Sequence, residues 1–155
     1  MLPLGAGHKP FAFLQTPANE NQGQFSPDGR WVAYTSDESG RDEVYIQSFP
    51  TPGSKRQVST AGGVQPRWRR DGKELFYLAS DRKLMAAPVR GEATLEVGVP
   101  AALFQTRLTY FGSAPPGNKQ AYDVASDGKR FVLLQPDEAA SPVTVVLNWT
   151  ARLRR

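Results

Sequence analysis

The chain has 155 residues, of which 39% are hydrophobic and 22% charged, a composition typical of a folded protein rather than a disordered one. It has no cysteine and one histidine, which excludes a disulfide scaffold, a thiol nucleophile and a Cys-ligated zinc site. The net charge is +4, and three of the positive charges belong to arginines at the C-terminus, so we expect a solvated basic tail and no nucleic-acid partner.

Three segments of the chain share one pattern: residues 25–34 (FSPDGRWVAY), 68–77 (WRRDGKELFY) and 124–133 (VASDGKRFVL). In each, a polar turn that contains Asp-Gly and a basic residue precedes a β-prone run, which predicts a β-hairpin. The Asp-Gly pairs are 43 and 56 residues apart, and the longer interval contains a loop-like insertion over residues 108–119. A period of about 40–45 residues with four strands is typical of a β-propeller blade.

The predicted strands follow this period along the chain. Residues 9–16 (KPFAFLQT) contain a first strand at 11–15, which is similar to residues 100–106 (PAALFQT) at the end of the second repeat. The other predicted strands are 22–25, 31–36, 43–49 and 55–59, then 65–69, 74–79, 84–89 and 101–105, and finally 121–124, 130–134 and 144–148.

We therefore expect an all-β fold, a β-propeller segment of three four-stranded antiparallel blades that is offset by one strand. Residues 1–16 would be a leader and an outer strand that completes another blade, and residues 17–60 and 61–106 would be blades 1 and 2. Residues 107–155 would be blade 3, with three strands and the basic tail.

Several of these residues resemble a known repeat. Residues 25–30 (FSPDGR), followed by 33–37 (AYTSD) and 44–46 (VYI), resemble the TolB-like propeller repeat. Over most of the chain the sequence is similar to the C-terminal propeller part of bacterial eukaryote-like serine/threonine protein kinases, in residues 9–16, 65–77 and 143–149 (VTVVLNW). It departs from the repeat at Arg69 and Arg70, where Ser-Pro is usual, and at Ala125 and Ser126.

The resemblance implies a non-catalytic module for protein–protein interaction or ligand sensing. It also favours a periplasmic or other extracytoplasmic location, although residues 1–10 do not read as a signal peptide and no apolar run is long enough for a membrane helix. Kinase motifs are absent from the sequence, so phosphoryl transfer is not expected. Two alternatives stay open: the gating propeller of a hydrolase or kinase whose catalytic domain is absent, and a fragment that forms a ring without a specific ligand.

The strand offset predicts a partner. Three blades would leave two apolar faces and one strand edge uncovered. Two chains joined head to tail would close a six-bladed ring, in which strand 11–15 of each chain completes the third blade of the other. We therefore expect a homodimer, against the alternative of a fragment that covers its open faces in another way.

Candidate binding residues lie where the connection into each innermost strand reaches the mouth of the predicted channel. These rim residues are Asn19, Glu20, Gln22, Gln65 and Arg67, which we expect to bind a protein or peptide, or else to hydrate the channel. We expect no catalytic residue, no bound cofactor and no metal ligand.

Other motif-like strings have simpler interpretations. Residues 126–129 (SDGK) match the Ser-x-x-Lys pattern of some acyl enzymes, but they align with the other Asp-Gly turns. The acidic residues around Gly40 are expected to form a solvated loop rather than a calcium site. The tryptophans at positions 31, 68 and 149 are expected to pack between blades, whereas a carbohydrate-stacking role would need one of them exposed near a groove.

Overall fold

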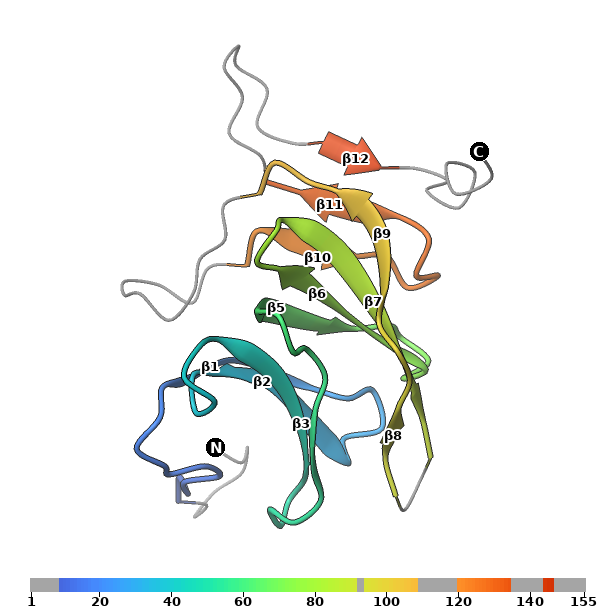
Figure 1. The fold of residues 1–155 in the computed structure, drawn as a ribbon. Coiled ribbons are helices and arrows are strands. Elements are labelled where there is room, and N and C mark those ends of the chain that lie inside the picture. Colours follow the sequence, from blue (N-terminus) through green and yellow to red (C-terminus); the bar gives the residue numbers. More distant parts are fainter. Residues whose placement is uncertain (1–8, 92–93, 109–119, 135–143, 147–155) are drawn as a thin grey trace.

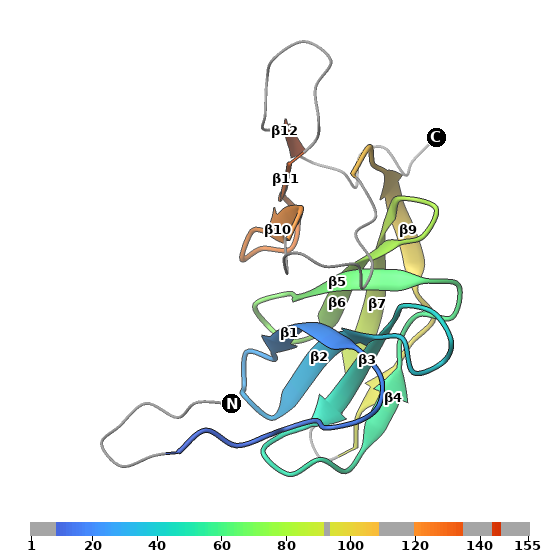
Figure 2. The same ribbon diagram turned by 90° about the vertical axis from the view of Figure 1, so that its left-hand side faces the viewer.

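The computed structural model describes residues 9–91, 94–108, 120–134 and 144–146. In these residues every regular element is a β-strand, and the strands form three antiparallel sheets (Figures 1 and 2). No helix that could cross a membrane occurs in this part of the chain. The all-β prediction is thus confirmed.

The first sheet has the order β1-β2-β3-β4. Strand β2 matches its predicted bounds, and the ends of the other three differ from prediction by one or two residues. The observed bounds are Glu20–Phe25 for β1, Trp31–Ser36 for β2, Glu43–Ser48 for β3 and Lys55–Gln57 for β4.

The second sheet differs from the prediction at its outer edge. Strands β5 (Gly63–Trp68), β6 (Glu74–Ala79) and β7 (Lys83–Arg90) pair in order. Two strands then share the outer edge of β7: β9 (Ala101–Gln105) pairs with its first half and β8 (Glu96–Val97) with its last two residues. The sequence predicted β9 but not β8.

The third sheet contains β10 (Tyr122–Val124), β11 (Phe131–Leu133) and β12 (Thr144–Val146) in that order. All three strands were predicted, with somewhat longer bounds. The predicted insertion after residue 108, the end of the last strand at residues 147–148 and the basic tail lie outside the described residues.

The three Asp-Gly turns have one geometry. Gly29, Gly72 and Gly128 have φ angles of 71°, 72° and 67°, a region that glycine reaches without steric cost. Each glycine N–H donates to the carbonyl of the residue three positions earlier, at 2.9 Å. These turns join β1 to β2, β5 to β6 and β10 to β11, so the predicted hairpins are confirmed.

The sheets stack face to face, and alternate residues of the middle strands form the two interfaces. Between the first and second sheets, Ala33 and Ile46 lie in one buried cluster with Leu75 and Tyr77. Between the second and third sheets, the intervening β6 residues Phe76 and Leu78 lie in another cluster, with Phe131 and Leu133 of β11. In the second sheet, therefore, one set of alternate residues faces the first sheet and the other set faces the third sheet, as the two-residue period of a strand requires.

The outer face of the first sheet is covered by the N-terminal segment of the same chain. Phe13 and Leu14 pack against a small cluster formed by Val32, Tyr34 and Tyr45. Within this single chain residues 9–16 form no strand, so the predicted strand at 11–15 has no sheet partner here. At the other end of the stack, Val132 points away from the second sheet and is 42% exposed.

Candidate functional site

Four of the five predicted rim residues lie on β1 and β5, the first strands of two sheets, and Asn19 directly precedes β1. We call the first strand of each sheet (β1, β5 and β10) its innermost strand. Strands β1, β5 and β10 lie next to one another in that order in both views (Figures 1 and 2). Polar side chains on these strands form hydrogen bonds from one sheet to the next. Two of them, Gln22 and Gln65, occupy equivalent positions in the repeat.

Gln22 connects the first sheet to the second. It lies in a bulge of β1, has a φ of 56° and is 4% exposed. Its Oε1 accepts a hydrogen bond from the Thr35 hydroxyl at 2.8 Å and another from the backbone N–H of Gln65 at 2.8 Å. The structure thus places this rim candidate inside the sheet interface.

Gln65 makes the equivalent connection between the second and third sheets. It occupies the same bulge position, with a φ of 58°, and is fully buried. Its Oε1 accepts from the backbone N–H of Ala121 at 2.7 Å, and its carbonyl accepts from the Tyr122 hydroxyl at 2.8 Å. Burial raises the pKa of Tyr122 well above its ordinary value, so this hydroxyl remains a donor.

The other two predicted residues of β1 and its approach hold the chain as it enters the first sheet. The backbone N–H and the side-chain amide of Asn19 donate to the two carboxylate oxygens of Asp37, at 2.8 and 2.7 Å. These bonds hold the pKa of Asp37 below its usual value. Glu20 accepts a hydrogen bond from the Thr16 hydroxyl. Asn19 is exposed and Glu20 half-buried.

Arg67 is the basic group on the innermost strands. Its guanidinium lies 3.7 Å from the carboxylate of Asp123, which occupies the equivalent position on β10. The Arg67 side chain is 20% exposed, whereas that of Asp123 is 74% exposed. This long ion pair leaves hydrogen-bonding capacity on the arginine.

Buried polar atoms without partners occur along the same strands. Among the described residues, Asn21 Oδ1, Gln65 Nε2, Arg67 Nε and Gln120 Oε1 are buried and accept or donate no hydrogen bond. Buried polar groups are nearly always hydrogen-bonded, so these atoms require a water or a ligand. Asn21 and Gln120 were not predicted, although they precede positions 22 and 121 and therefore share one place in the repeat.

The motif-like strings occupy ordinary structural positions. Residues 126–129 form the third Asp-Gly turn, in which the backbone N–H of Lys129 donates to Asp127 at 2.9 Å. In the loop around Gly40, Asp37 binds Asn19, Glu38 pairs with Lys55, and Glu43 accepts from Arg41. The described residues contain no group of three or more acidic or histidine side chains arranged to hold a metal.

Comparison with known proteins adds no family assignment. No protein-family model matches the sequence, and a search of curated proteins finds no match. The candidate site is therefore defined by the geometry of the three innermost strands.

Proposed function

We propose that this chain is a segment of a TolB-like β-propeller that binds a protein or peptide partner along its innermost strands and has no catalytic activity of its own. Three features support the propeller interpretation: the repeated Asp-Gly turns, the stacking of the three sheets in chain order, and the equivalent hydrogen bonds that Gln22 and Gln65 make to the following sheet. Propellers usually bind partners at the channel that their innermost strands surround.

One observation carries the proposal. The buried atoms without a hydrogen bond on or beside the innermost strands include two donors, on Gln65 and Arg67, and two acceptors, on Asn21 and Gln120. The Arg67 donor has only the long ion pair with Asp123. A buried polar group that lacks a hydrogen bond costs about 1–3 kcal/mol. The side chains of Asn21, Arg67 and Gln120 are half-buried and can meet a partner. A peptide main chain offers both N–H and C=O groups at regular spacing, so it can satisfy the donor and the two acceptors at once.

Selection from a random-peptide phage library, followed by NMR mapping of one selected peptide, tests this site. We expect the largest chemical-shift changes in the side chains of Asn21, Arg67 and Gln120. Arg67→Gln should weaken binding at least tenfold, and Arg70→Gln, a matched change at an exposed arginine, should not. Peptides that map elsewhere, or that tolerate Arg67→Gln, would contradict the proposal.

We also propose that two chains associate head to tail into a six-bladed ring. The support is the pair of apolar faces at the ends of the stack: Val32 and Tyr34 lie under the N-terminal segment, and Val132 is exposed. In the ring, residues 11–15 would leave their own first sheet and extend the third sheet of the partner.

Light scattering on a sizing column tests the ring. A mass of about 34 kDa, twice the 17.0 kDa of one chain, is expected, and a mass of one chain would refute it. Deletion of residues 1–16 should abolish the dimer. A truncated protein that remains a folded dimer would refute strand exchange while leaving the ring intact.

A further inference from the structure

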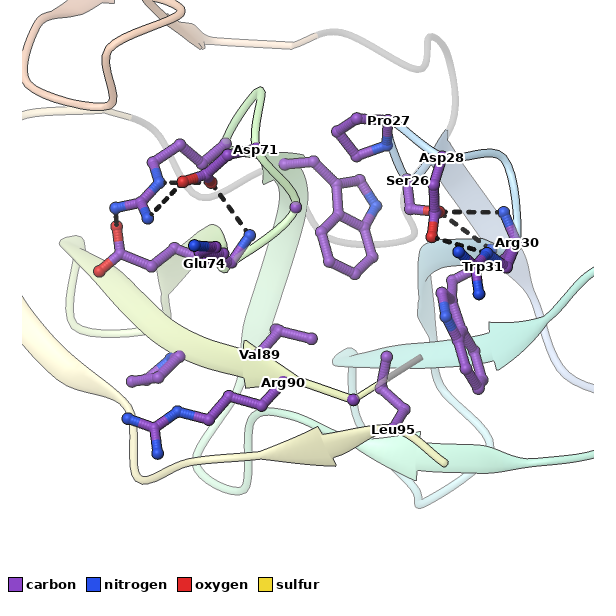
Figure 3. A pocket seen from close by; sticks show the side chains of 16 residues that line it. Ser26, Pro27, Asp28, Arg30, Trp31, Asp71, Glu74, Val89, Arg90 and Leu95 are labelled. Atoms are coloured by element: carbon purple, nitrogen blue, oxygen red, sulfur yellow. Dashed lines mark hydrogen bonds and ion pairs between the residues drawn. The ribbon is translucent and has the colours of Figure 1, made fainter. Parts of the chain in front are cut away.

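A hollow of about 770 Å³ lies between the first and second sheets, beside their Asp-Gly turns. Figure 3 shows Ser26, Asp28 and Arg30 on one side of it and Asp71 and Glu74 on the other. The end of β7 and Leu95, which directly precedes β8, close it from below. None of the unpartnered residues of the innermost strands lines this hollow, so it is a separate feature.

Part of the surface of the hollow is apolar and held in place by the two sheets. Pro27 of the first turn lies 3.8 Å from the position that a Cβ at Gly72 would take, so the two turns are close across the hollow. The indole N–H of Trp68 donates to the Gln24 carbonyl at 3.3 Å, which holds the ring at the interface. On the floor, Leu95 is 2% exposed and belongs to the core between the sheets.

The carboxylates that line the hollow already have partners. Asp28 accepts from the Ser26 hydroxyl at 2.6 Å and pairs with Arg30 at 3.1 Å. Arg69 pairs with both Asp71 and Glu74, each at 2.6 Å. The Ser26 hydrogen bond lowers the pKa of Asp28, so this carboxylate stays ionised and bound at neutral pH.

Two cations at the hollow have no such partner. Lys73 and Arg90 are exposed, and neither forms an ion pair with any described carboxylate, although the charge of Lys73 helps to lower the pKa of Asp71. They lie at the same end of adjacent strands, since the backbone N–H of Val89 donates to the Lys73 carbonyl at 2.9 Å. Arg90 lies opposite Glu96 in the pairing of β7 with β8, but Glu96 does not line the hollow.

We propose that this hollow binds an acidic peptide segment of a partner protein, with a hydrophobic side chain on the Pro27 and Trp68 surface and carboxylates on Lys73 and Arg90. Its volume lies within the range of about 300–1,000 Å³ typical of ligand sites. Four basic side chains line it against three acidic ones, so the charge complements an anion. The accessible apolar surface of Pro27 and Trp68 favours a peptide over a phosphate, which has no hydrophobic part to bury.

Three synthetic heptapeptides test the ligand class. Each has a central phenylalanine, flanked by glutamates in the first, glutamines in the second and lysines in the third. Binding is followed by the indole N–H resonance of Trp68. The glutamate peptide should bind at least tenfold more tightly than the glutamine peptide, and added salt should weaken it. No binding, or equal affinity for the two peptides, overturns the proposal.

Substitutions locate the binding. The double variant Lys73→Gln and Arg90→Gln should weaken binding of the glutamate peptide at least tenfold, and both positions are exposed, so folding should be retained. Arg56→Gln, at an exposed arginine on β4, is the matched control and should have no effect. Equal loss in the control overturns the site, as does displacement of the peptide by inorganic phosphate or an oligonucleotide at similar concentration.

Discussion

The side-chain oxygen of Gln22 accepts a hydrogen bond from the backbone N–H of Gln65, 43 residues later and in the next sheet. Gln65 repeats this arrangement toward Ala121. The two glutamines thus fix the spacing of the innermost strands, because each supplies the partner that a backbone N–H pointing out of the following sheet requires. Ala121 ends the series, since its side chain has no acceptor.

We expect Gln22→Asn to lower the free energy of unfolding by about 1–3 kcal/mol, because it leaves the Gln65 N–H buried without a partner. Asparagine tolerates the positive φ at this position, so the backbone should be retained. Gln24→Asn is the control, because the side chain of Gln24 has no hydrogen bond within the described residues. Urea denaturation measures both, and an equal loss in the two variants would count against the connection.

Local sequence signals predicted the hairpins well. Strands β2, β6 and β9 have their predicted bounds, because Asp-Gly turns and β-prone runs define them within a few residues. The direction in which the Gln22 and Gln65 side chains point was not predictable from these local signals. Each lies in a bulge with positive φ, which changes the side-chain alternation, and glutamine does not mark a bulge as glycine would.

Two further features depend on tertiary context. Strand β8 has two residues, and it forms because β7 extends beyond the end of β9 and leaves an edge to pair. The atoms of the candidate site that lack hydrogen bonds come from β1, β5 and the segment directly before β10, which are distant in sequence, so only the stacking of the sheets brings them together. Sequence repeats nevertheless predicted which strands would come first in each sheet.

Two glycine substitutions separate steric conflict from backbone strain. A Cβ at Gly63 would lie 2.4 Å from Ser59 Oγ, whose hydroxyl also accepts from the Val44 N–H. A Cβ at Gly29 would contact nothing within 4 Å, but the φ of 71° is unfavourable for alanine. Gly63→Ala should therefore destabilise by up to about 3 kcal/mol and Gly29→Ala by about 1 kcal/mol in thermal or urea unfolding. The reverse order would contradict the described packing.

Stability should fall in acid because Arg69 holds the pKa of Asp71 below its ordinary value by hydrogen bonding. A carboxyl with a lowered folded pKa contributes stability above its unfolded pKa of about 3.9, and this contribution is lost as the pH falls through the folded pKa. Asp71→Asn should be less stable than the parent chain at pH 7 and similar to it at pH 2. Glu96→Gln, at an exposed position on β8, should follow the parent at both pH values. A constant difference between Asp71→Asn and the parent would exclude this contribution.

In the proposed ring, Val132 would be buried at the interface between the two chains. The Val132 side chain lies on the face of the third sheet that points away from the second sheet. Phe76 has the equivalent position in the second sheet, and there it is buried against Phe131. In a ring Val132 would meet the first sheet of the partner, so Val132→Asp should place an unpaired charge in an apolar interface and reduce the mass in solution to that of one chain. Val99→Asp is the control, because Val99 is 88% exposed and lies in the connection between β8 and β9. A dimer that survives Val132→Asp, or that is lost equally with Val99→Asp, would show that the third sheet does not pair with a partner chain through this face.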